Sequence, residues 1–457
     1  MDDLSRPIIP PAHPVHDTPL PRWRVLFEFF RNPLTTYSKQ AFETTFGRMR
    51  GIGAETVGVA APAAIARVMT INQSNYVRPV IQPRLFRPVM GKGVFLAEGQ
   101  DWRRQRRMLA PVFNPGAIGD LIPHFKDAGA RMIAALTGKS QVQLTEVFHR
   151  AALDAVLRAL FSLPADESRA GMSTMVREFL NGAGRPNLLD ALATSEGDFP
   201  WTLGKRRAFE KAWLAQVDGI IAARKSRGGD GSHKRGDLLD LLLSARDPQT
   251  GEGVPDAEVR DQCSTMLAAG FETTSRLLFW ASYLLALDQT QQALIREEVR
   301  AFPPDQVQSM DDLGRWPHLK CALLEALRLY PPVAYIVRKA IADDVLAGES
   351  IKAGTEVWIS PFIIHRHRKF WDNPTAFMPE RFAGVPSPWT SMDHFLPFGA
   401  GPRICIGAAF SITEAQIILA HLLSAYELKL EDKRPVLPVF RLATVPDHDP
   451  CFTLAPL

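Results

Sequence analysis

The sequence predicts a mainly α-helical protein, with a helix-rich lobe and a smaller β-sheet region near the N-terminus. Long segments rich in Ala, Leu, Arg and Glu place apolar residues three and four positions apart, which is typical of helices packed on a core. Only two short stretches, 51–60 and 345–360, carry Val and Ile interrupted by Gly, as short strands do. No change of composition and no internal repeat divides the 457 residues, so we expect a single domain over 1–457.

The predicted elements follow in chain order. Prolines crowd residues 1–35, which form a Pro-rich N-terminal segment, and the apolar patch Val25–Phe30 within it is expected to pack on the core. The periodicity then predicts helices at 121–136, 151–161, 206–224 and 409–425. The stretch GGDGSHKRG at 228–236 is predicted to be a flexible connector between two helices.

One predicted helix is much longer than the others. It begins at Asp256 and ends near Leu287, and its apolar residues occupy most of the circumference, so we expect it to cross the middle of the domain over about 45 Å. Within it, the segment Ala269–Thr274 (AGFETT) combines a Gly, which lowers helix propensity by about 1 kcal/mol, with a Glu and two hydroxyls among apolar neighbours. This segment indicates either tolerance in a stable helix or a groove where a small ligand meets a proton source.

Charge and cysteine usage exclude several classes of function. The 53 Lys and Arg balance 49 Asp and Glu without dense basic tracts, so nucleic acid is not expected as a partner. The 4 cysteines lie far apart without a CxxC pair, which argues against a structural zinc site or a disulfide framework and favours a cytoplasmic location. An acidic start and the lack of an apolar run of about 18 residues predict neither a secretion signal nor a membrane anchor. His365 and His367, in the run HRH, are expected at the surface.

The clearest chemical signal surrounds Cys405. The segment Phe398–Gly407 (FGAGPRICIG) precedes a helical pattern that starts near Ala408, so Cys405 is expected at a helix N-terminus, where backbone N–H groups and the helix dipole favour a thiolate. An accessible thiolate serves as a nucleophile or as a metal ligand. A cysteine protease would need a partner His and an oxyanion hole, and no such signature surrounds this residue. Ligation of haem iron fits better, because Arg403 could neutralise a haem propionate.

These residues resemble the cysteine-ligand loop of the cytochrome P450 monooxygenases. The family pattern FxxGxRxCxG is matched at each fixed position, and further family motifs occur in family order across about residues 30–455. The matches are Phe398, Gly401, Arg403, Cys405 and Gly407 for the loop, Glu325–Arg328 for ExxR, Pro379–Phe382 for PERF, Ala269–Thr273 for AGxET, and Trp102–Arg106 for WxxxR. The resemblance implies the P450-type fold of a soluble, bacterial-type member without a fused reductase, with haem b between the long helix and the Cys405 loop.

The resemblance also implies how the haem is held. Cys405 would be the axial ligand of the iron. The other implied haem contacts are Arg403, Trp102, Arg106, Arg338, Phe398, Gly399, Gly407 and Ala269. Glu325 and Arg328 lie one helical turn apart, and by resemblance Arg381 joins them in a buried structural cluster.

The long helix and the family's pocket positions carry the implied chemistry. Thr273 would hydrogen-bond dioxygen, Glu272 would connect the site to solvent protons, and Gly270 would leave room for the diatomic molecule. The walls of the substrate pocket are implied to be largely apolar, which predicts a hydrophobic substrate such as a fatty acid, terpenoid, steroid or aromatic compound. The implied wall residues are Phe86, Val89, Met90, Leu267, Ala268, Ala334 and Ile336. Arg87 or Arg441 could hold a substrate carboxylate.

The implied activity is hydroxylation of an apolar small molecule with O2 by a monomer, with electrons from a separate ferredoxin-type donor and an NAD(P)H-dependent reductase. Arg103, Arg104 and Arg107 are either simply solvated or part of a basic surface that attracts an acidic donor. One alternative is a peroxide-driven peroxygenase, a class that commonly lacks the pair Glu272–Thr273. The other is a non-catalytic haem protein that binds a ligand or senses a gas.

Overall fold

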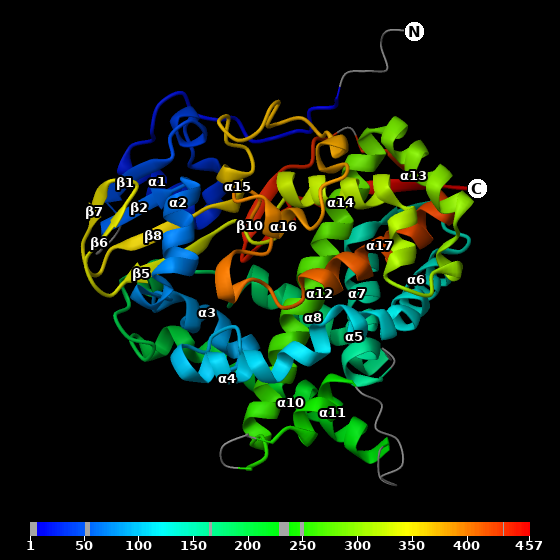
Figure 1. The fold of residues 1–457 in the computed structure, drawn as a ribbon, viewed down its shortest axis with the longest axis horizontal. Coiled ribbons are helices and arrows are strands. Elements are labelled where there is room, and N and C mark those ends of the chain that lie inside the picture. The colour runs from blue at the N-terminus through cyan, green and yellow to red at the C-terminus, as the bar shows by residue number, and fades with distance from the viewer. Residues whose placement is uncertain (1–6, 51–54, 164–166, 228–236, 247–250, 433) are drawn as a thin grey trace.

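The computed structural model describes residues 7–50, 55–163, 167–227, 237–246, 251–432 and 434–457. A broad body of helices carries a β-rich region along one side (Figure 1). The first helices are α1 (Arg22–Arg31), α2 (Pro62–Ala66), α3 (Ile81–Met90), α4 (Gly99–Leu109), α5 (Pro115–Asp120), α6 (Ile122–Leu136), α7 (Leu144–Phe161), α8 (Glu167–Asn181), α9 (Leu188–Leu192) and α10 (Gly204–Arg227). They are followed by α11 (Leu238–Ser244), α12 (Asp256–Leu287), α13 (Gln289–Ala301), α14 (Pro317–Leu329), α15 (Pro361–Ile364), α16 (Pro388–Ser391) and α17 (Ala408–Ala425).

The strands form small sheets. They are β1 (Phe46–Arg50), β2 (Glu55–Val59), β3 (Tyr76–Val77), β4 (Gln141–Gln143), β5 (Ile336–Ala340), β6 (Asp344–Leu346), β7 (Glu349–Ile351), β8 (Glu356–Ile359), β9 (Tyr426–Leu430), β10 (Pro438–Arg441), β11 (Ala443–Pro446) and β12 (Cys451–Pro456). A five-stranded sheet has the order β1-β2-β8-β5-β3, in which only β2 and β8 pair in parallel. The remaining strands form a sheet β4-β12-β9 and the hairpins β6-β7 and β10-β11. The largest sheet therefore combines the N-terminal region with strands from 336–359.

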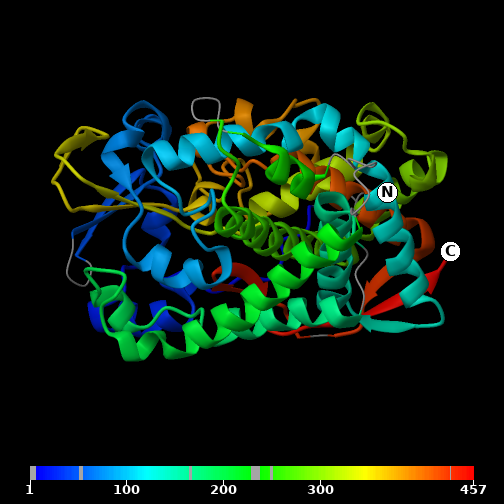
Figure 2. The same cartoon turned by 90° about the horizontal axis from the view of Figure 1, so that it is seen from below.

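The predicted fold class and the main helices are confirmed. The long helix α12 runs from Asp256 to Leu287 as predicted, and α6, α7, α10 and α17 contain the other predicted helical segments. α12 packs against α7, α10, α14 and α17 and crosses the middle of the molecule (Figure 2). Its burial explains why its apolar residues surround most of its circumference. The predicted connector at 228–236 lies outside the described residues.

One expectation about burial is met only in part and another is wrong. Most of the patch Val25–Phe30 is half-buried, and Phe29 packs against Trp358 with ring centroids 5.6 Å apart, but Phe27 is 62% exposed because only one face of the amphipathic α1 covers the molecule. His365 and His367 are fully buried, since the chain passes through the interior after α15. The His365 ring accepts a hydrogen bond of 2.8 Å from the backbone N–H of Leu396. A charged run is thus no guide to exposure when its side chains find buried partners.

The helix α17 is the one described helix long and apolar enough to span a membrane, with a mean hydropathy of 1.3. Within the molecule 78% of it is buried. This burial is what the core helix of a globular protein requires, and it places the residues after Cys405 against α12.

Candidate active site

A cavity of about 2160 Å³ lies between α12 and the Cys405 loop. On α12 its lining residues include Met266, Ala269, Gly270 and Thr273, whose spacing places them on one face of the helix. From the predicted pocket, the lining contains Phe86, Val89, Met90, Ala268 and Ile336.

Two residues predicted for the pocket are not among its lining. Leu267 is fully buried in the main core, because it lies a step around α12 from the cavity face. Ala334 belongs to a separate apolar cluster with Leu34 and Phe362.

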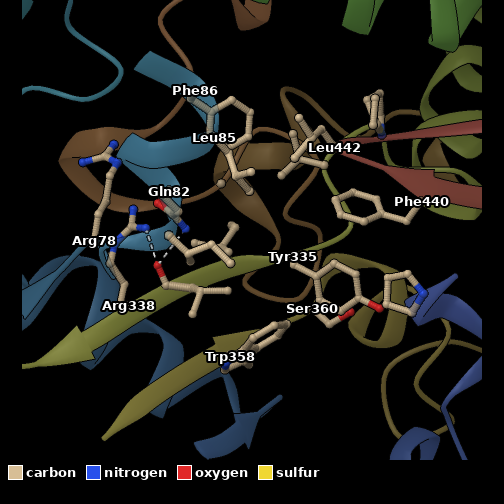
Figure 3. Close-up of a pocket in the computed structure, with 18 of the residues that line it drawn as sticks. Arg78, Gln82, Leu85, Phe86, Tyr335, Arg338, Trp358, Ser360, Phe440 and Leu442 are labelled. Carbon is tan, nitrogen blue, oxygen red and sulfur yellow. Dashed lines mark hydrogen bonds between the residues drawn. The ribbon is translucent and has the colours of Figure 1, made fainter. Parts of the chain in front are cut away.

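The sequence analysis also missed part of the cavity wall. Figure 3 shows Leu85 and Phe86 of α3 facing Leu442 and Phe440 of the β10–β11 hairpin across the cavity. Leu442 forms the tip of this hairpin with a positive φ of 63°, a left-handed conformation that is uncommon for Leu. Only tertiary structure brings this hairpin to α3, so no local pattern could have identified it.

The Cys405 loop presents its sulfur to the cavity. The backbone N–H of Cys405 donates to the carbonyl of Phe398 over 2.9 Å, which closes the loop ahead of α17. Gly401 has a φ of 67°. A Cβ there would lie 2.1 Å from the carbonyl oxygen of Met69, so only glycine fits.

The surroundings of the Cys405 sulfur have opposing effects on its pKa. Burial raises the pKa of the Cys405 thiol, while the backbone N–H of Gly407 and the charge of Arg106 lower it in part. The helix begins at Ala408 with Gly407 as its N-cap, so Cys405 lies ahead of the first turn rather than in it. Burial is the largest influence on the pKa of this thiol, so a cationic metal would have to supply the remaining stabilisation of the thiolate.

The residues predicted to hold the haem all border this cavity. They are Trp102, Arg106, Arg338, Arg403, Ala269, Phe398, Gly399, Cys405 and Gly407. The Arg403 guanidinium lies over the Trp102 ring, 4.4 Å from its centroid, and donates to the carbonyl of Ala97 over 2.9 Å. These contacts hold the guanidinium and the indole as one unit on the cavity wall.

Arg78 was missed by the sequence analysis. It lines the same part of the cavity and pairs with Glu98 over 2.6 Å, and Glu98 also pairs with Arg403. Arg338 is only 8% exposed, and burial together with the charges of Arg78 and Arg403 lowers its pKa to about 9. Arg78 and Arg403 thus share the single carboxylate of Glu98, and Arg338 lies near them without an ion pair of its own among the described residues. This excess of positive charge suits a ligand with two carboxylates, as haem has.

Thr273 and Gly270 lie where α12 meets the cavity. The Thr273 hydroxyl donates to the carbonyl of Ala269 over 2.8 Å. A Cβ at Gly270 would lie 3.1 Å from a methyl group of Val156 on α7. Helix packing against α7 therefore accounts for the glycine, and room for a diatomic ligand stays a prediction.

Glu272 lies between the side chains of Arg276 and His149. Its Oε1 accepts a hydrogen bond from Nε of Arg276 over 2.9 Å, and its Oε2 lies 3.0 Å from Nε2 of the fully buried His149. Burial raises the pKa of Glu272, but Arg276 and His149 outweigh burial and lower it to about 2. Glu272 is therefore ionised in the folded protein, and its predicted role in connecting the site to solvent protons stays a prediction.

Glu414 of α17 is a second buried acid, which the sequence analysis missed. It is fully buried, and no described residue donates a well-formed hydrogen bond to either of its carboxyl oxygens. Burial raises the pKa of Glu414 well above its usual value, and the nearby Thr274 hydroxyl offsets this only in part. Burial therefore favours the protonated form of the Glu414 carboxyl. A lone Glu in an otherwise apolar helix was the available sequence signal.

The structure brings together Glu325, Arg328 and Arg381. Arg328 donates to both carboxylate oxygens of Glu325, each over 2.7 Å, and both side chains are fully buried. Arg381 adds a contact of 3.1 Å to the same carboxylate. The remaining N–H groups of Arg328 donate to the carbonyls of His365, Pro374 and Ala376. Every donor of this guanidinium is thus satisfied, as a buried charge requires.

The remaining predicted arginines have different surroundings. Arg103 and Arg107 are exposed on α4, whereas Arg104 pairs with Glu258 of α12 over 2.6 Å. Arg87 pairs with Glu196 and does not line the cavity, whereas Arg441 lines it.

Fold and site together define a haem-thiolate protein, because an accessible thiol, glycines that allow close approach and surplus arginines surround one cavity. The family model for cytochrome P450 matches residues 16–449. The chain belongs to the cytochrome P450 family and is a cytochrome P450 monooxygenase with a haem cofactor.

Relatives come from three kingdoms of life. The chain is 31% identical to a cytokinin hydroxylase of Arabidopsis thaliana over 80% of this chain and 73% of that protein. It is 29% identical to the cyclooctat-9-en-7-ol 5-monooxygenase of Streptomyces melanosporofaciens over 77% of each chain. It is also 30% identical to cytochrome P450 4A10 of Mus musculus over 79% of this chain and 74% of that protein. These relatives do not single out a bacterial subtype.

The fold has solved counterparts. The crystal structure of the cytochrome P450DA heme domain superposes with a TM-score of 0.79 and 23% identity, and the alignment covers 98% of both chains. At this identity the match supports the arrangement of helices and sheets.

Proposed function

We propose that this protein uses O2 to hydroxylate a largely hydrophobic small molecule in the cytosol, as a soluble, bacterial-type monomer. Electrons would come from a separate ferredoxin-type donor and its NAD(P)H-dependent reductase. The observation that carries the proposal is that Cys405 and Thr273 line one large cavity whose other walls are mostly apolar. The names of the relatives support hydroxylation but do not point to a single substrate skeleton, because one names a cytokinin and another names cyclooctat-9-en-7-ol.

Several residues of the chain would hold the haem. Cys405 would bind the iron, and Arg78, Arg106, Arg338 and Arg403 would hold the propionates. When bound, a thiolate-ligated haem supplies the reductive activation of O2. The chain supplies placement and the exclusion of water by apolar walls.

Protons are held at defined atoms of the chain. Burial raises the pKa of the Glu414 carboxyl and so favours its protonated form, and Thr274 lies beside it. Thr273, which directly precedes Thr274 on α12, lines the cavity. We infer that Glu414 delivers protons towards these hydroxyls, while Glu272 stays ionised between Arg276 and His149.

The test is turnover by the haem-loaded protein with a ferredoxin, a reductase and NAD(P)H. Apolar compounds that shift the Soret band would be supplied as substrates, and products would be identified by mass spectrometry. Product that contains one oxygen atom from ¹⁸O2 supports the proposal. If such ligands bind but no partner supports product formation, the protein is a haem-based sensor or carrier. If only peroxide supports it, the protein is a peroxygenase.

A further inference from the structure

The segment 89–94 comprises the end of α3 and the first residues of the loop that leads to α4, and it forms one wall of the cavity through Val89, Met90 and Val94. The last carbonyls of a helix have no partners within it, so those at the end of α3 need donors from elsewhere. Val89 and Met90 are the last two residues of α3. What binds their carbonyls therefore fixes where their side chains lie.

The carbonyl of Val89 receives two side-chain donors. The hydroxyl of Ser264 on α12 donates to it over 2.6 Å, and the indole N–H of Trp213 on α10 lies 3.0 Å away. The same indole N–H lies 2.7 Å from the Ser264 oxygen, and both side chains are fully buried. Two helices thus meet the end of α3 at one oxygen atom.

The residues that follow Val89 make further hydrogen bonds with side chains of α12. Thr265 donates its hydroxyl to the carbonyl of Met90 over 2.7 Å. Asp261 accepts from the backbone N–H of Lys92 over 2.9 Å. Gln262 accepts from the backbone N–H of Val94 over 3.1 Å.

Two glycines make this close approach possible. A Cβ at Gly91 would lie 2.2 Å from Oδ1 of Asp261, and one at Gly93 would lie 2.1 Å from Oγ1 of Thr265. No larger residue fits at either position without moving the segment away from α12. The two glycines and the hydrogen bonds therefore both indicate that the segment 89–94 is held tightly against α12.

The helix that holds this wall also carries the reactive face of the cavity. Thr273 follows Thr265 by 8 residues on α12, which is about 12 Å at 1.5 Å per residue. We propose that Ser264, Thr265 and Trp213 are positioning residues that determine specificity, because they fix Val89 and Met90 relative to the face of α12 that bears Thr273. The inference rests on the proposed function, since it concerns which part of a substrate reaches that face.

The experiment measures wall placement without catalysis. The ferric, haem-loaded protein is titrated with 1-phenylimidazole and with 4-phenylimidazole, whose ring nitrogen binds iron while the phenyl group points in different directions. The test variant is the double substitution Ser264→Ala, Thr265→Val, which removes two hydroxyl donors with little change of volume. The matched control is Ser282→Ala, because Ser282, like Ser264, is a fully buried serine of α12 outside the cavity lining, but its hydroxyl has no hydrogen-bond partner among the described residues.

The expected result is a change of at least about threefold in the ratio of the two dissociation constants in the double variant, because the carbonyls of Val89 and Met90 each lose a hydroxyl donor. The ratio stays unchanged in Ser282→Ala. Hydrogen exchange of the backbone N–H groups of Lys92 and Val94 becomes faster only in the double variant. Restoring one hydroxyl, as Ser264→Ala with Thr265 intact, gives an intermediate ratio.

An unchanged ratio with unchanged hydrogen exchange in the double variant would overturn the inference, as would an equal change in Ser282→Ala. Failure of the proposed function is distinguishable, because it would abolish product formation and leave these ligand titrations as they are.

Discussion

Replacing Glu325 by Gln removes the charge that balances two arginines in the interior. Glu325 and Arg328 are both 0% exposed, and Arg328 would keep its charge with only carbonyl partners left. Breaking a buried ion pair in this way costs about 3–5 kcal/mol. Unfolding entropy of about 2.1 cal/mol/K per residue amounts to about 1 kcal/mol/K for 457 residues. The melting temperature should therefore fall by about 3–5 °C.

The assay is thermal unfolding of the haem-loaded protein by circular dichroism, with haem content measured by absorbance after purification. Glu380→Gln is the matched control, since Glu380 is exposed and adjacent to Arg381. The control should unfold at the wild-type temperature with full haem. A Glu325→Gln protein that also unfolds there with full haem would refute the reasoning.

The other predictions concern protons and the propionate site. Thr273→Val, which keeps the shape of the side chain, should lower the product formed per O2 consumed several-fold while sparing peroxide-driven turnover, as measured by oxygen uptake and product yield. Glu414→Gln should reduce O2-driven turnover at little cost in melting temperature at low pH. Wild type should lose stability as pH rises from 4.5, the usual pKa of a Glu, towards the raised pKa of Glu414, and the Gln variant should lose less. For Glu272, whose pKa is lowered to about 2, the sign is opposite: its contribution is present above 4.5 and is lost as pH falls towards 2, so Glu272→Gln should flatten the acid limb of the unfolding curve. Arg78→Ala should reduce haem retention against apomyoglobin as acceptor, and equal retention would count against its role in binding propionate.

Much of the fold was predictable because its signals are local. The boundaries of α12 follow from apolar residues around its circumference, and the Cys405 loop follows from glycines that only particular backbone angles explain. The order of the five-stranded sheet was not predictable, since β2 pairs with β8 from a distant part of the chain. Long-range pairing leaves no periodic trace in either strand.

The residues of the candidate site could be predicted where a motif requires a particular residue type. They could not be predicted where the chemistry of a side chain depends on how the fold buries it. The contact of Glu272 with Arg276, one helical turn away, could be expected from the sequence, whereas its contact with His149, distant in sequence, could not. Glu414 and Arg78 escaped notice because their importance depends on what surrounds them in space. Leu267 was assigned to the cavity by its neighbours in the motif, whereas its angle around α12 turns it into the core.

The most direct measurement is the carbon monoxide difference spectrum of the reduced protein beside that of Cys405→Ser. With sulfur as the iron ligand, the wild-type protein gives the long-wavelength Soret band of a thiolate-bound haem, and the serine variant loses that band or the pigment itself. An identical spectrum from both proteins would contradict the assignment of Cys405 as the haem ligand.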